Sequence, residues 1–389
     1  MKITYRLLIS IVLIAKFFFP ITTHSAENPP ANQKYFLYVG NYTSKTDSQG
    51  IYLFEFSPDT GKLTSKGLAA ETTDPSWLVV HPNKKFLYSV NESGKSSTVS
   101  AFAIDPKSGK LTFLNKLPAL GEDPCYLSID KTGKYLLVAN YTSGNVVVFP
   151  ISLDGHLGEH TALQSDQGPV GPNKERQEAP HAHWIEPSAH NHFVYVSDLG
   201  LDRVLIYKFD EANGALTPGA PIDHFSASLA PGDGPRHVAF APDGKFMYVL
   251  AELTSTVTVF ANDGQETFRS IQEISALPKG FTDRNDAAEI AILPNGKFLY
   301  TSNRGHDSIA IFSIDPAKGT LTKIDDVPTG GKEPRNFVID PTGRYLLAEN
   351  QNTNTIVEFR IDSATGKLTQ TGELTHTPSP ICIVFLPEQ

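Results

Sequence analysis

The chain has 389 residues, of which 40% are hydrophobic, so it can bury a large core. Its formal net charge is −9, with 33 basic against 42 acidic residues. This balance argues against nucleic acid as a partner, because nucleic-acid-binding proteins need a basic surface.

The first 26 residues have the pattern of a secretory signal peptide. Lys2 and Arg6 precede an apolar run from Leu7 to Ile21, and small polar residues follow, with Ser25 or Ala26 as the last residue before cleavage. An uncleaved membrane anchor is the alternative, although the run is short for a bilayer span. We therefore expect a periplasmic or secreted protein without stable membrane association, with one domain over residues 27–389.

A stretch that predicts the inner strands of a β-propeller blade recurs along the chain. The copies are spaced by about 46–56 residues, the range of propeller blades. They begin at Pro75, Pro124, Pro180, Pro235, Ala287 and Pro334. In each copy a first strand, a tight turn such as Asp243–Gly244 and a second strand precede two further strands. The pattern predicts four antiparallel strands per unit.

The two ends of the chain supply complementary parts of one further unit. Residues from Lys34 begin at a second strand, whereas Pro380–Leu386 is a first strand with nothing after it. We expect Pro380–Leu386 to pair with Lys34–Asn41. The predicted fold is therefore all-β: a seven-bladed β-propeller closed by N- and C-terminal strands that share one blade, rather than an open stack of sheets.

Ionisable residues recur at two positions that lie on one face of such a fold. The start of the innermost strand and the end of the second strand both meet the mouth of the central channel. The first-strand starts carry His181, His183, Arg236, His237 and Arg335. The second-strand ends carry Glu92, Tyr141, Asp198, Glu252, Arg304 and Gln351. Ionisable groups converging in a concave pocket are typical of a functional site, and this set suits an anionic small molecule.

Three long connections between blades belong to the same face. They span residues 161–180, 221–234 and 275–287, and the first carries Arg176. Long loops on a rigid scaffold often hold binding residues. Arg176 is therefore a candidate for substrate binding.

Five segments carry a resemblance to a known family. They are "GPNKERQEAPHAHWI", "SDLGLDRVLIYKFD", "GDGPRHVAFAPDGKFMYVLAEL", "LPNGKFLYTSNRGHDSIAIF" and "PRNFVIDPTGRYLLAENQ". They resemble the lactonase family of seven-bladed propellers, which includes 6-phosphogluconolactonase and the fungal 3-carboxy-cis,cis-muconate lactonizing enzyme. The resemblance covers essentially the whole mature chain. It places the family's site at His181 or His183, Arg236, Glu252 and Arg304. Glu349 departs from the expected small apolar residue and adds a carboxylate that could alter the preferred substrate charge.

The resemblance implies lactone hydrolysis, which needs an activated water, stabilisation of the carbonyl oxygen and an acid for the leaving alkoxide. Glu252 is the candidate general base, or alternatively a carboxylate that orients Arg236 or Arg304. His181 or His183 would polarise the carbonyl or donate the proton, unless it only binds a loop. Arg304 completes the candidate catalytic set.

The remaining candidates would bind the substrate. Arg236, His237, Arg335 and Arg176 would hold a carboxylate or phosphate, a task that suits the guanidinium fork, although the arginines could instead pair neighbouring blades. A zinc site of the two histidines and a glutamate is the alternative chemistry, but the arginines would repel a cation. We expect no metal and no cofactor.

Other notable residues have structural interpretations. We expect Asp198, Asp202 and Arg203 to fix a loop, and Trp77 and Trp184 to pack in the core or channel wall. Cys125 and Cys382 fall in first strands separated by one whole blade, beyond the Cα separation of about 7 Å that a disulfide permits. We expect both to be buried free thiols.

Together these features predict an exported, monomeric lactonase acting on a sugar-derived or acidic lactone, similar to 6-phosphogluconolactonase. A muconate-type cycloisomerase is the second enzyme hypothesis. A propeller that binds a ligand without catalysis is the third.

Overall fold

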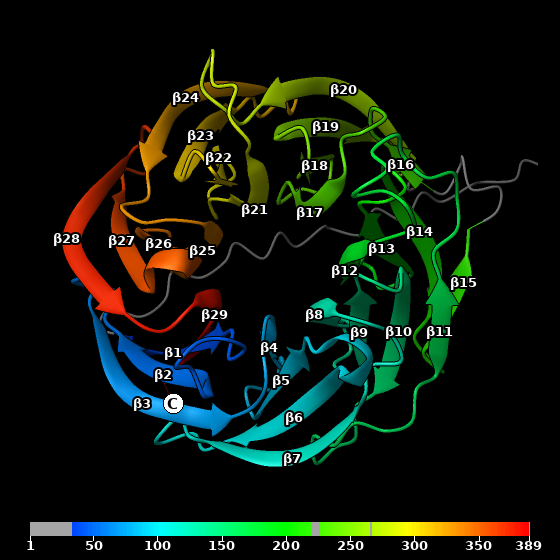
Figure 1. Ribbon diagram of the computed structural model, residues 1–389, viewed down its shortest axis with the longest axis vertical. Coiled ribbons are helices and arrows are strands. Elements are labelled where there is room, and N and C mark those ends of the chain that lie inside the picture. Colours follow the sequence, from blue (N-terminus) through cyan, green and yellow to red (C-terminus); the bar gives the residue numbers. More distant parts are fainter. Residues whose placement is uncertain (1–32, 220–225, 265–266, 389) are drawn as a thin grey trace, which may run out of the picture.

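The computed structural model describes residues 33–219, 226–264 and 267–388. Seven antiparallel sheets stand around a central channel, as the repeats predicted (Figure 1). The expected signal peptide, residues 1–26, lies outside the described residues. Within those residues, no helix has the length and apolarity that a bilayer span requires.

Each blade runs from an innermost to an outermost strand. Blade 1 comprises β29 (Pro380–Pro387), β1 (Tyr35–Asn41), β2 (Gly50–Phe56) and β3 (Leu63–Glu71); blade 2 comprises β4 (Leu78–Val80), β5 (Phe86–Asn91), β6 (Thr98–Ile104) and β7 (Leu111–Pro118). Blade 3 comprises β8 (Pro124–Ile129), β9 (Tyr135–Asn140), β10 (Asn145–Pro150) and β11 (Ala162–Ser165); blade 4 comprises β12 (Ala182–Pro187), β13 (Phe193–Asp198), β14 (Arg203–Asp210), β15 (Ala215–Pro218) and β16 (Ser226–Ser228).

The remaining blades complete the ring. Blade 5 comprises β17 (Pro235–Phe240), β18 (Phe246–Ala251), β19 (Thr256–Asn262) and β20 (Phe268–Ser275); blade 6 comprises β21 (Asp286–Ile292), β22 (Phe298–Arg304), β23 (Ser308–Ile314) and β24 (Leu321–Pro328). Blade 7 comprises β25 (Pro334–Ile339), β26 (Tyr345–Asn350), β27 (Thr355–Ile361) and β28 (Leu368–His376). Two short 3₁₀ helices, η1 (Gly94–Ser96) and η2 (Gln351–Thr353), lie in connections between second and third strands.

The two ends of the chain close the ring as predicted. β29 pairs with β1 in antiparallel register, with Tyr35 opposite Pro387 and Gly40 opposite Cys382. All seven residues of β1 are buried. Figure 1 shows the two strands side by side, the last strand in red and the first in blue. The first and last described strands thus lie in one sheet.

Blade 4 differs from the four-strand pattern, because its outermost strand is in two pieces. β15 pairs with the end of β14 from Tyr207 to Asp210, and β16 pairs with its beginning from Arg203 to Leu205. β15 ends at Pro218. Proline has no N–H to give to a β-ladder, which fits its place at the end of this strand piece.

Tyrosine side chains fasten neighbouring blades to each other. The hydroxyl of Tyr38 in blade 1 donates to the carbonyl of Gly109 in blade 2 at 2.7 Å. The hydroxyl of Tyr248 in blade 5 donates to the carbonyl of Gly319 in blade 6 at 3.0 Å. Tyr88 and Tyr300 repeat the contact at Gly155 and Gly366. The hydroxyls of these four buried tyrosines are thus hydrogen-bonded, while the rings fill the space between neighbouring sheets.

Six innermost strands begin with a one-residue register shift that matters for the site. In β17, Pro235 lies opposite Ala251 and His237 opposite Leu250, which leaves Arg236 as the additional residue. The additional residues of the other strands are Cys125, His183, Ala288, Arg335 and Ile381. Such β-bulges redirect one side chain out of the regular alternation and are frequent at active sites.

A buried asparagine ends the second strand in most blades and holds the incoming connection. The side-chain amides of Asn140, Asn303 and Asn350 donate to carbonyls of the preceding connection at 3.0–3.2 Å. Asn41 and Asn91 donate in the same way to the carbonyls of Pro378 and Thr73 in blades 1 and 2. The asparagine therefore holds the connection that enters the blade close to the residue that follows the asparagine.

Blade 4 has Asp198 at this position, facing Asp166 of the long connection. Burial raises the pKa of both carboxyls, and the nearness of Asp198 further raises the pKa of Asp166. Oδ1 of Asp198 accepts hydrogen bonds from the backbone N–H groups of His181 and Leu201 at 2.9 Å. Asp202 accepts from the N–H groups of Gly232 and Gly234. The loop-fixing roles expected for Asp198 and Asp202 agree with these contacts.

Arg203 and the two tryptophans also occupy structural positions. Arg203 donates to the hydroxyl of Ser226, across the β14–β16 pair. Trp184 is 2% exposed in the core, and Trp77 stacks on Tyr126 with ring centroids 4.2 Å apart. The two tryptophans thus pack as expected, whereas the contact of Arg203 joins two strands of blade 4.

The two cysteines are free and buried, as predicted. Cys125 lies in β8 of blade 3 and Cys382 in β29 of blade 1, so blade 2 separates them. The fold therefore depends on sheet packing and ring closure rather than on a disulfide.

Removal of β29 should prevent stable folding. A chain ending at Ser379 would lose an innermost strand and leave the N–H and C=O groups of β1 unpaired in a buried position. We expect the truncated chain to be aggregated or degraded, whereas a chain shortened only by Glu388 and Gln389 should fold. Size-exclusion chromatography and thermal melting of both would test this. A cooperative melt of the shorter chain near the parent value would contradict the closure argument.

Glu349 should make stability fall as the pH rises. Its side chain is fully buried, neither carboxyl oxygen has a hydrogen-bond partner among the described residues, and burial raises its pKa well above the usual value. The folded state then retains a proton that the unfolded state releases above about pH 4.5, so the free energy of unfolding decreases with pH beyond that point.

Glu349→Gln should reduce the slope with which the free energy of unfolding falls with pH, by up to about 1.4 kcal/mol per pH unit. Urea unfolding between pH 5 and pH 9 measures the effect, with Glu71→Gln as a control at an exposed position. Parallel curves for Glu349→Gln and the parent would contradict it.

Candidate active site

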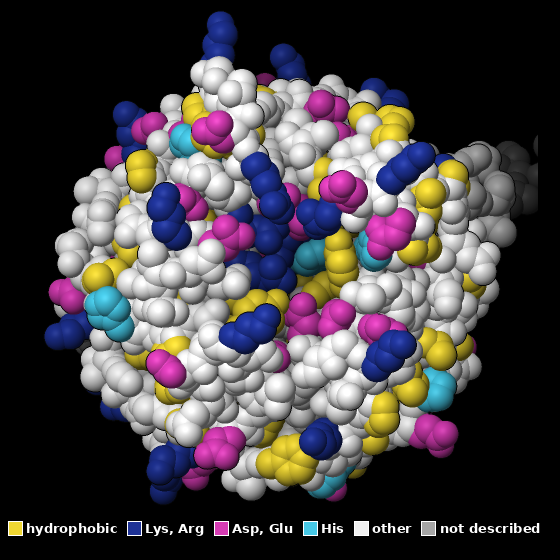
Figure 2. Space-filling view, in the orientation of Figure 1, with side chains coloured by type: hydrophobic (Ala, Val, Ile, Leu, Met, Phe, Trp, Pro, Cys, Tyr) yellow, Lys and Arg dark blue, Asp and Glu magenta, His cyan; other side chains and the backbone are white. Residues whose placement is uncertain are grey.

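The channel mouth holds a cavity of about 420 Å³ on the face that carries the blade connections. Bulge residues and second-strand ends form much of its wall, and Figure 2 shows Lys and Arg side chains gathered in this central hollow. The lining residues are Tyr42, Glu92, Cys125, Tyr141, Arg176, His183, Glu252, Arg284, Asp286, Arg304, Glu333 and Arg335.

Glu252 lies at the centre of an arginine cluster. Its Oε1 is 2.5 Å from Nη2 of Arg176, and its Oε2 is 3.0 Å from Nε of Arg236 and 3.1 Å from Nη2 of Arg304. The Glu252 side chain is 5% exposed. Three guanidinium groups from three segments of the chain therefore share one buried carboxylate.

The charge state of Glu252 follows from these neighbours. Burial alone would raise its pKa, but the guanidinium groups of Arg304, Arg236 and Arg176 lower the pKa to about 2. Glu252 is thus an anion throughout the neutral range. A carboxylate with so low a pKa is a weak base, so in this state it orients the arginines, which was the alternative interpretation of this residue.

The arginines of the cluster differ in their position. Arg304 lines the cavity, and its Nε donates to the carbonyl of Asp286 at 3.1 Å. Arg236 is 2% exposed and contacts Glu252 from behind the cavity wall. Burial, followed by repulsion from Arg304 and Arg335, lowers the pKa of Arg236 to about 10, so it stays charged at neutral pH. Arg236 therefore supports Glu252 rather than forming the wall.

Gly305 explains the Arg-Gly pair at the end of β22. It has φ of +121°, and a Cβ atom there would lie 2.3 Å from the carbonyl oxygen of Arg284. Only glycine allows the connection 275–287 to pass so close to the strand end. The close approach brings Asp286 beside Arg304.

Arg176 reaches the site from the long connection 161–180. Besides Glu252, it contacts Tyr141 at 3.3 Å and Asp286 at 3.5 Å. The neighbouring Gln177 anchors the loop by donating to the Leu199 carbonyl and to Asp202. The connection thus places a cation in the cavity, as expected for a loop of this length.

The two histidines of the segment "PHAHW", His181 and His183, lie in different surroundings. His183 is the bulge residue of β12 and lines the cavity, with its Nε2 3.9 Å from Oε2 of Glu252. Burial, and then the charge of Arg236, lowers the pKa of His183 well below its usual value, so its imidazole is neutral. His183 is therefore an uncharged base at the cavity wall.

His181 lies outside the described cavity lining, because β12 begins one residue later, at Ala182. Its Nδ1 is 3.0 Å from the Tyr141 carbonyl, and its ring stacks on Tyr141. Its Nε2 is 3.2 Å from Glu178. These contacts fit the loop-binding alternative better than a catalytic role.

Arg335 lines the cavity apart from the cluster. It is the bulge residue of β25, and its guanidinium lies 5.6 Å from the ring centroid of Tyr42. Within the part of the chain that the structure describes, it has no carboxylate within ion-pair distance. Burial opposes its charge, but Tyr42 and the charges of Glu92 and Glu252 more than offset this and raise its pKa. Arg335 is therefore a charged group available to an anion.

Several neighbouring residues were not predicted as site residues. Tyr42 follows the asparagine of blade 1 as Glu252 follows β18, and its hydroxyl donates to Glu92 at 2.9 Å. Asp286 precedes the bulge of β21. Tyr42 directly follows the strand-ending asparagine, so aligning this position across the repeats would have identified it. His237 and its partner Glu289 lie behind Arg236 and outside the described lining, so His237 is not placed as a direct substrate ligand.

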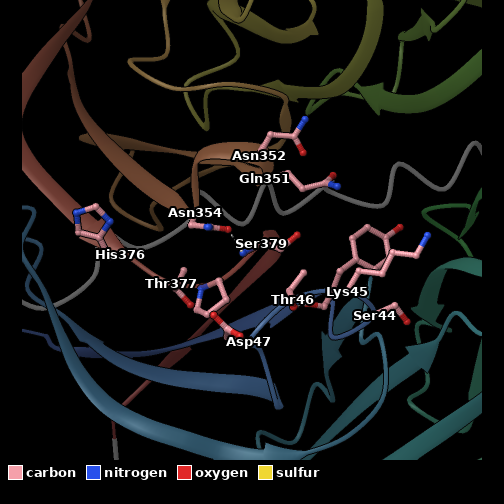
Figure 3. A pocket seen from close by; sticks show the side chains of 12 residues that line it. Ser44, Lys45, Thr46, Asp47, Gln351, Asn352, Asn354, His376, Thr377 and Ser379 are labelled. Atoms are coloured by element: carbon pink, nitrogen blue, oxygen red, sulfur yellow. Dashed lines mark hydrogen bonds between the residues drawn. The ribbon is translucent and has the colours of Figure 1, made fainter.

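A second cavity, of about 680 Å³, adjoins the first at Tyr42. Figure 3 shows its wall of amides and hydroxyls, including Gln351, Asn352, Asn354 and Ser379, with Lys45 and His376 at its edges. It holds no counterpart of the buried Glu252 cluster among the described residues. The smaller cavity is thus the better candidate for chemistry.

A metal ion does not fit the arginine cluster. Among the described residues, no group of three or more His, Cys, Asp and Glu side chains is arranged to hold one. Glu252 is already surrounded by cations. The arrangement suits an anion.

Comparison with known proteins agrees with this geometry. A family described as "Lactonase, 7-bladed beta-propeller" matches residues 36–385. The chain belongs to this lactonase family. The 6-phosphogluconolactonase of Bacillus subtilis is 40% identical over 308 residues, covering 79% of this chain and 85% of the relative.

Two further relatives give the same result. The 6-phosphogluconolactonase of Formosa agariphila is 37% identical over 312 residues, covering 78% of this chain and 86% of the relative. The periplasmic gluconolactonase PpgL of Pseudomonas aeruginosa has a TM-score of 0.86 at 32% identity, covering 92% of this chain and all of that one. The enzyme class predicted from the sequence, a lactone hydrolase, is thus confirmed.

Replacing Glu252 by glutamine should destabilise the protein in a pH-dependent manner. The change leaves the buried Arg236 and Arg304 and the partly exposed Arg176 without their shared counter-charge, which should cost about 3–5 kcal/mol at pH 7. Because the pKa of Glu252 is lowered to about 2, its stabilising contribution is present above about pH 4.5 and is lost as the pH falls toward 2.

Chemical unfolding of the parent and Glu252→Gln at several pH values measures this difference. Glu55→Gln is the control, because Glu55 pairs with Lys34 and Lys66 at the surface and should contribute less than about 1 kcal/mol. A difference that does not shrink below pH 4 would contradict the assigned charge state.

Proposed function

We propose that the protein hydrolyses the lactone of a sugar acid that carries a further anionic group, phosphate or carboxylate. The observation that carries this proposal is Arg335, a charged group at the cavity wall without a carboxylate partner among the described residues. Arg176 and Arg304 line the same cavity. The relatives named 6-phosphogluconolactonase and gluconolactonase support a sugar-derived substrate.

The roles of the residues follow from their positions and charges. Water attacks the lactone carbonyl carbon, and neutral His183 accepts its proton. Glu252, 3.9 Å away, stabilises the resulting imidazolium. Arg304 and Arg176 stabilise the negative charge on the carbonyl oxygen of the tetrahedral intermediate. The ring C–O bond then breaks, and His183 returns the proton to the leaving alkoxide, which yields the open hydroxy acid.

We also propose that the enzyme acts outside the cytoplasm. The charged and then apolar pattern of residues 1–26 supports export, and PpgL is a periplasmic relative. Sugar phosphates are mainly cytoplasmic, so export favours a carboxylate-bearing lactone over a phosphorylated one. N-terminal sequencing of the mature protein from cell fractions would test the location.

The activity is tested with a panel of purified lactones. 6-Phosphogluconolactone, glucono-δ-lactone, a glucaric acid lactone and muconolactone would be compared by pH-stat titration of the acid released. Hydrolysis of the anionic sugar lactones supports the proposal, whereas muconolactone turnover alone indicates a cycloisomerase. Binding without turnover by the parent, unchanged in Glu252→Gln, would indicate a binding protein.

Arg335→Gln should raise KM for the anionic lactones without raising it for glucono-δ-lactone. A lost charge-assisted hydrogen bond costs about 1.5–3 kcal/mol, or about 10–150-fold in KM. Arg284→Gln is the control, since the Arg284 side chain is 84% exposed at the rim of the same cavity. An equal rise in KM for the neutral lactone would show that Arg335 does not select the anion.

A further inference from the structure

Behind the cavity wall, a chain of buried polar contacts links blade 6 to Glu252. Nη1 of Arg236 is 3.2 Å from Nε2 of His237, and Nδ1 of His237 is 3.1 and 3.0 Å from the two oxygens of Glu289. His237 is 2% exposed and Glu289 is 8% exposed. Nε of Arg236 is 3.0 Å from Glu252. The contacts therefore run in the order Glu289, His237, Arg236, Glu252.

The bulges explain why His237 and Glu289 meet. Each residue directly follows the bulge of its innermost strand, His237 in β17 and Glu289 in β21, so the two occupy the same position in neighbouring blades. Other blades have Tyr126, Trp184, Asn336 and Cys382 there. The pairing of an imidazole with a carboxylate is thus particular to blades 5 and 6.

Both partners are held rigidly. The Glu289 backbone N–H donates to the Ser302 hydroxyl at 3.0 Å, and the Glu289 carboxylate accepts from the Ile290 N–H at 2.9 Å. The His237 ring meets Trp77 and Tyr126 edge to face, with centroids 5.3 and 5.2 Å apart. These contacts keep the imidazole and the carboxylate side by side.

The charge state of His237 determines which nitrogen carries the proton. Burial lowers its pKa to about 4, although Glu289 acts in the opposite direction, so the imidazole is neutral at pH 7. A neutral imidazole has one N–H. The Glu289 carboxylate can only accept, so Nδ1 donates to it. Nε2 is then the acceptor for the N–H of Arg236.

This arrangement fixes one edge of the Arg236 guanidinium. Nη1 donates both to Nε2 of His237 and to the carbonyl of Ala288 at 2.5 Å. The edge with Nε is left facing Glu252. The opposite tautomer would place an N–H of His237 against an N–H of Arg236.

We propose that Glu289 is a positioning residue: it selects the Nδ1–H tautomer of His237, and His237 in turn holds Arg236 against Glu252. The effect on catalysis rests on the proposed lactonase function, but the tautomer does not. Glu289 itself is not among the residues that line the cavity.

Glu289→Gln tests this inference, because the amide can donate to Nδ1 and favour the wrong tautomer, as carboxylate-to-amide changes beside a histidine do. NMR of protein labelled with ¹⁵N at histidine reports the tautomer, with the His237 signals identified by their loss in His237→Gln. We expect Nδ1–H in the parent and a shift toward Nε2–H in Glu289→Gln, with kcat/KM reduced about 10–100-fold.

Two further variants make the result decisive. Glu289→Asp keeps the acceptor and should retain the Nδ1–H tautomer and more activity, and it also serves if Glu289→Gln fails to fold. Glu358→Gln removes another fully buried carboxyl, in β27, and should leave the His237 tautomer unchanged. An Nε2–H tautomer in the parent, or unchanged tautomer and activity in Glu289→Gln, would overturn the inference. Absent lactonase activity in the parent, with the expected tautomers, would count against the proposed function alone.

Discussion

Three guanidinium groups can lie close together here because the carboxylate of Glu252 lies between them. Two like charges 4 Å apart repel by about 4 kcal/mol at an effective dielectric constant of 20, so the cluster would separate without a common anion. The three arginines come from the connection 161–180, from β17 and from β22. Glu252 therefore holds one long loop and two blades in register at the channel mouth.

The propeller makes this charge arrangement possible by repeating two positions around the channel. The bulge that begins six of the innermost strands turns one side chain out of the sheet, and the residue after the strand-ending asparagine lies at the same level. Neighbouring blades thus bring unrelated residue types to within ion-pair distance. Ring closure by β29 keeps the blades at fixed spacing, and the tyrosine contacts between sheets resist sliding. Because the ring is rigid, it can hold the charged side chains in fixed positions near one another instead of letting them turn toward solvent.

The periodic part of the structure could be predicted from the sequence, and the aperiodic part could not. Blade number, ring closure, the two free thiols and the meeting of Arg236, Glu252 and Arg304 follow from the repeat. Arg236 was expected on the cavity wall but, unlike the bulge residues His183 and Arg335, it contacts Glu252 from behind the wall. His237, the residue after the bulge, also lies outside the described lining. The path of the connection 161–180 has no counterpart in other blades, so the contact of Arg176 with Glu252 could not be derived. Glu289 was not among the predicted site residues, although its alignment with His237 in the repeat would have revealed the pair.

The cluster also suggests how binding and chemistry are coupled under the proposed function. The oxyanion that forms at the substrate carbonyl competes with Glu252 for its cations, and the three cations are not equally free to respond. Arg236 is anchored by Ala288 and His237, whereas the Arg176 side chain is 31% exposed on a loop. Arg176 is therefore the cation that can turn toward the substrate. Its departure removes one of the charges that lower the pKa of Glu252 and leaves more negative charge beside His183, 3.9 Å away. The imidazole then accepts a proton more readily while Arg176 stabilises the charge that develops on the carbonyl oxygen.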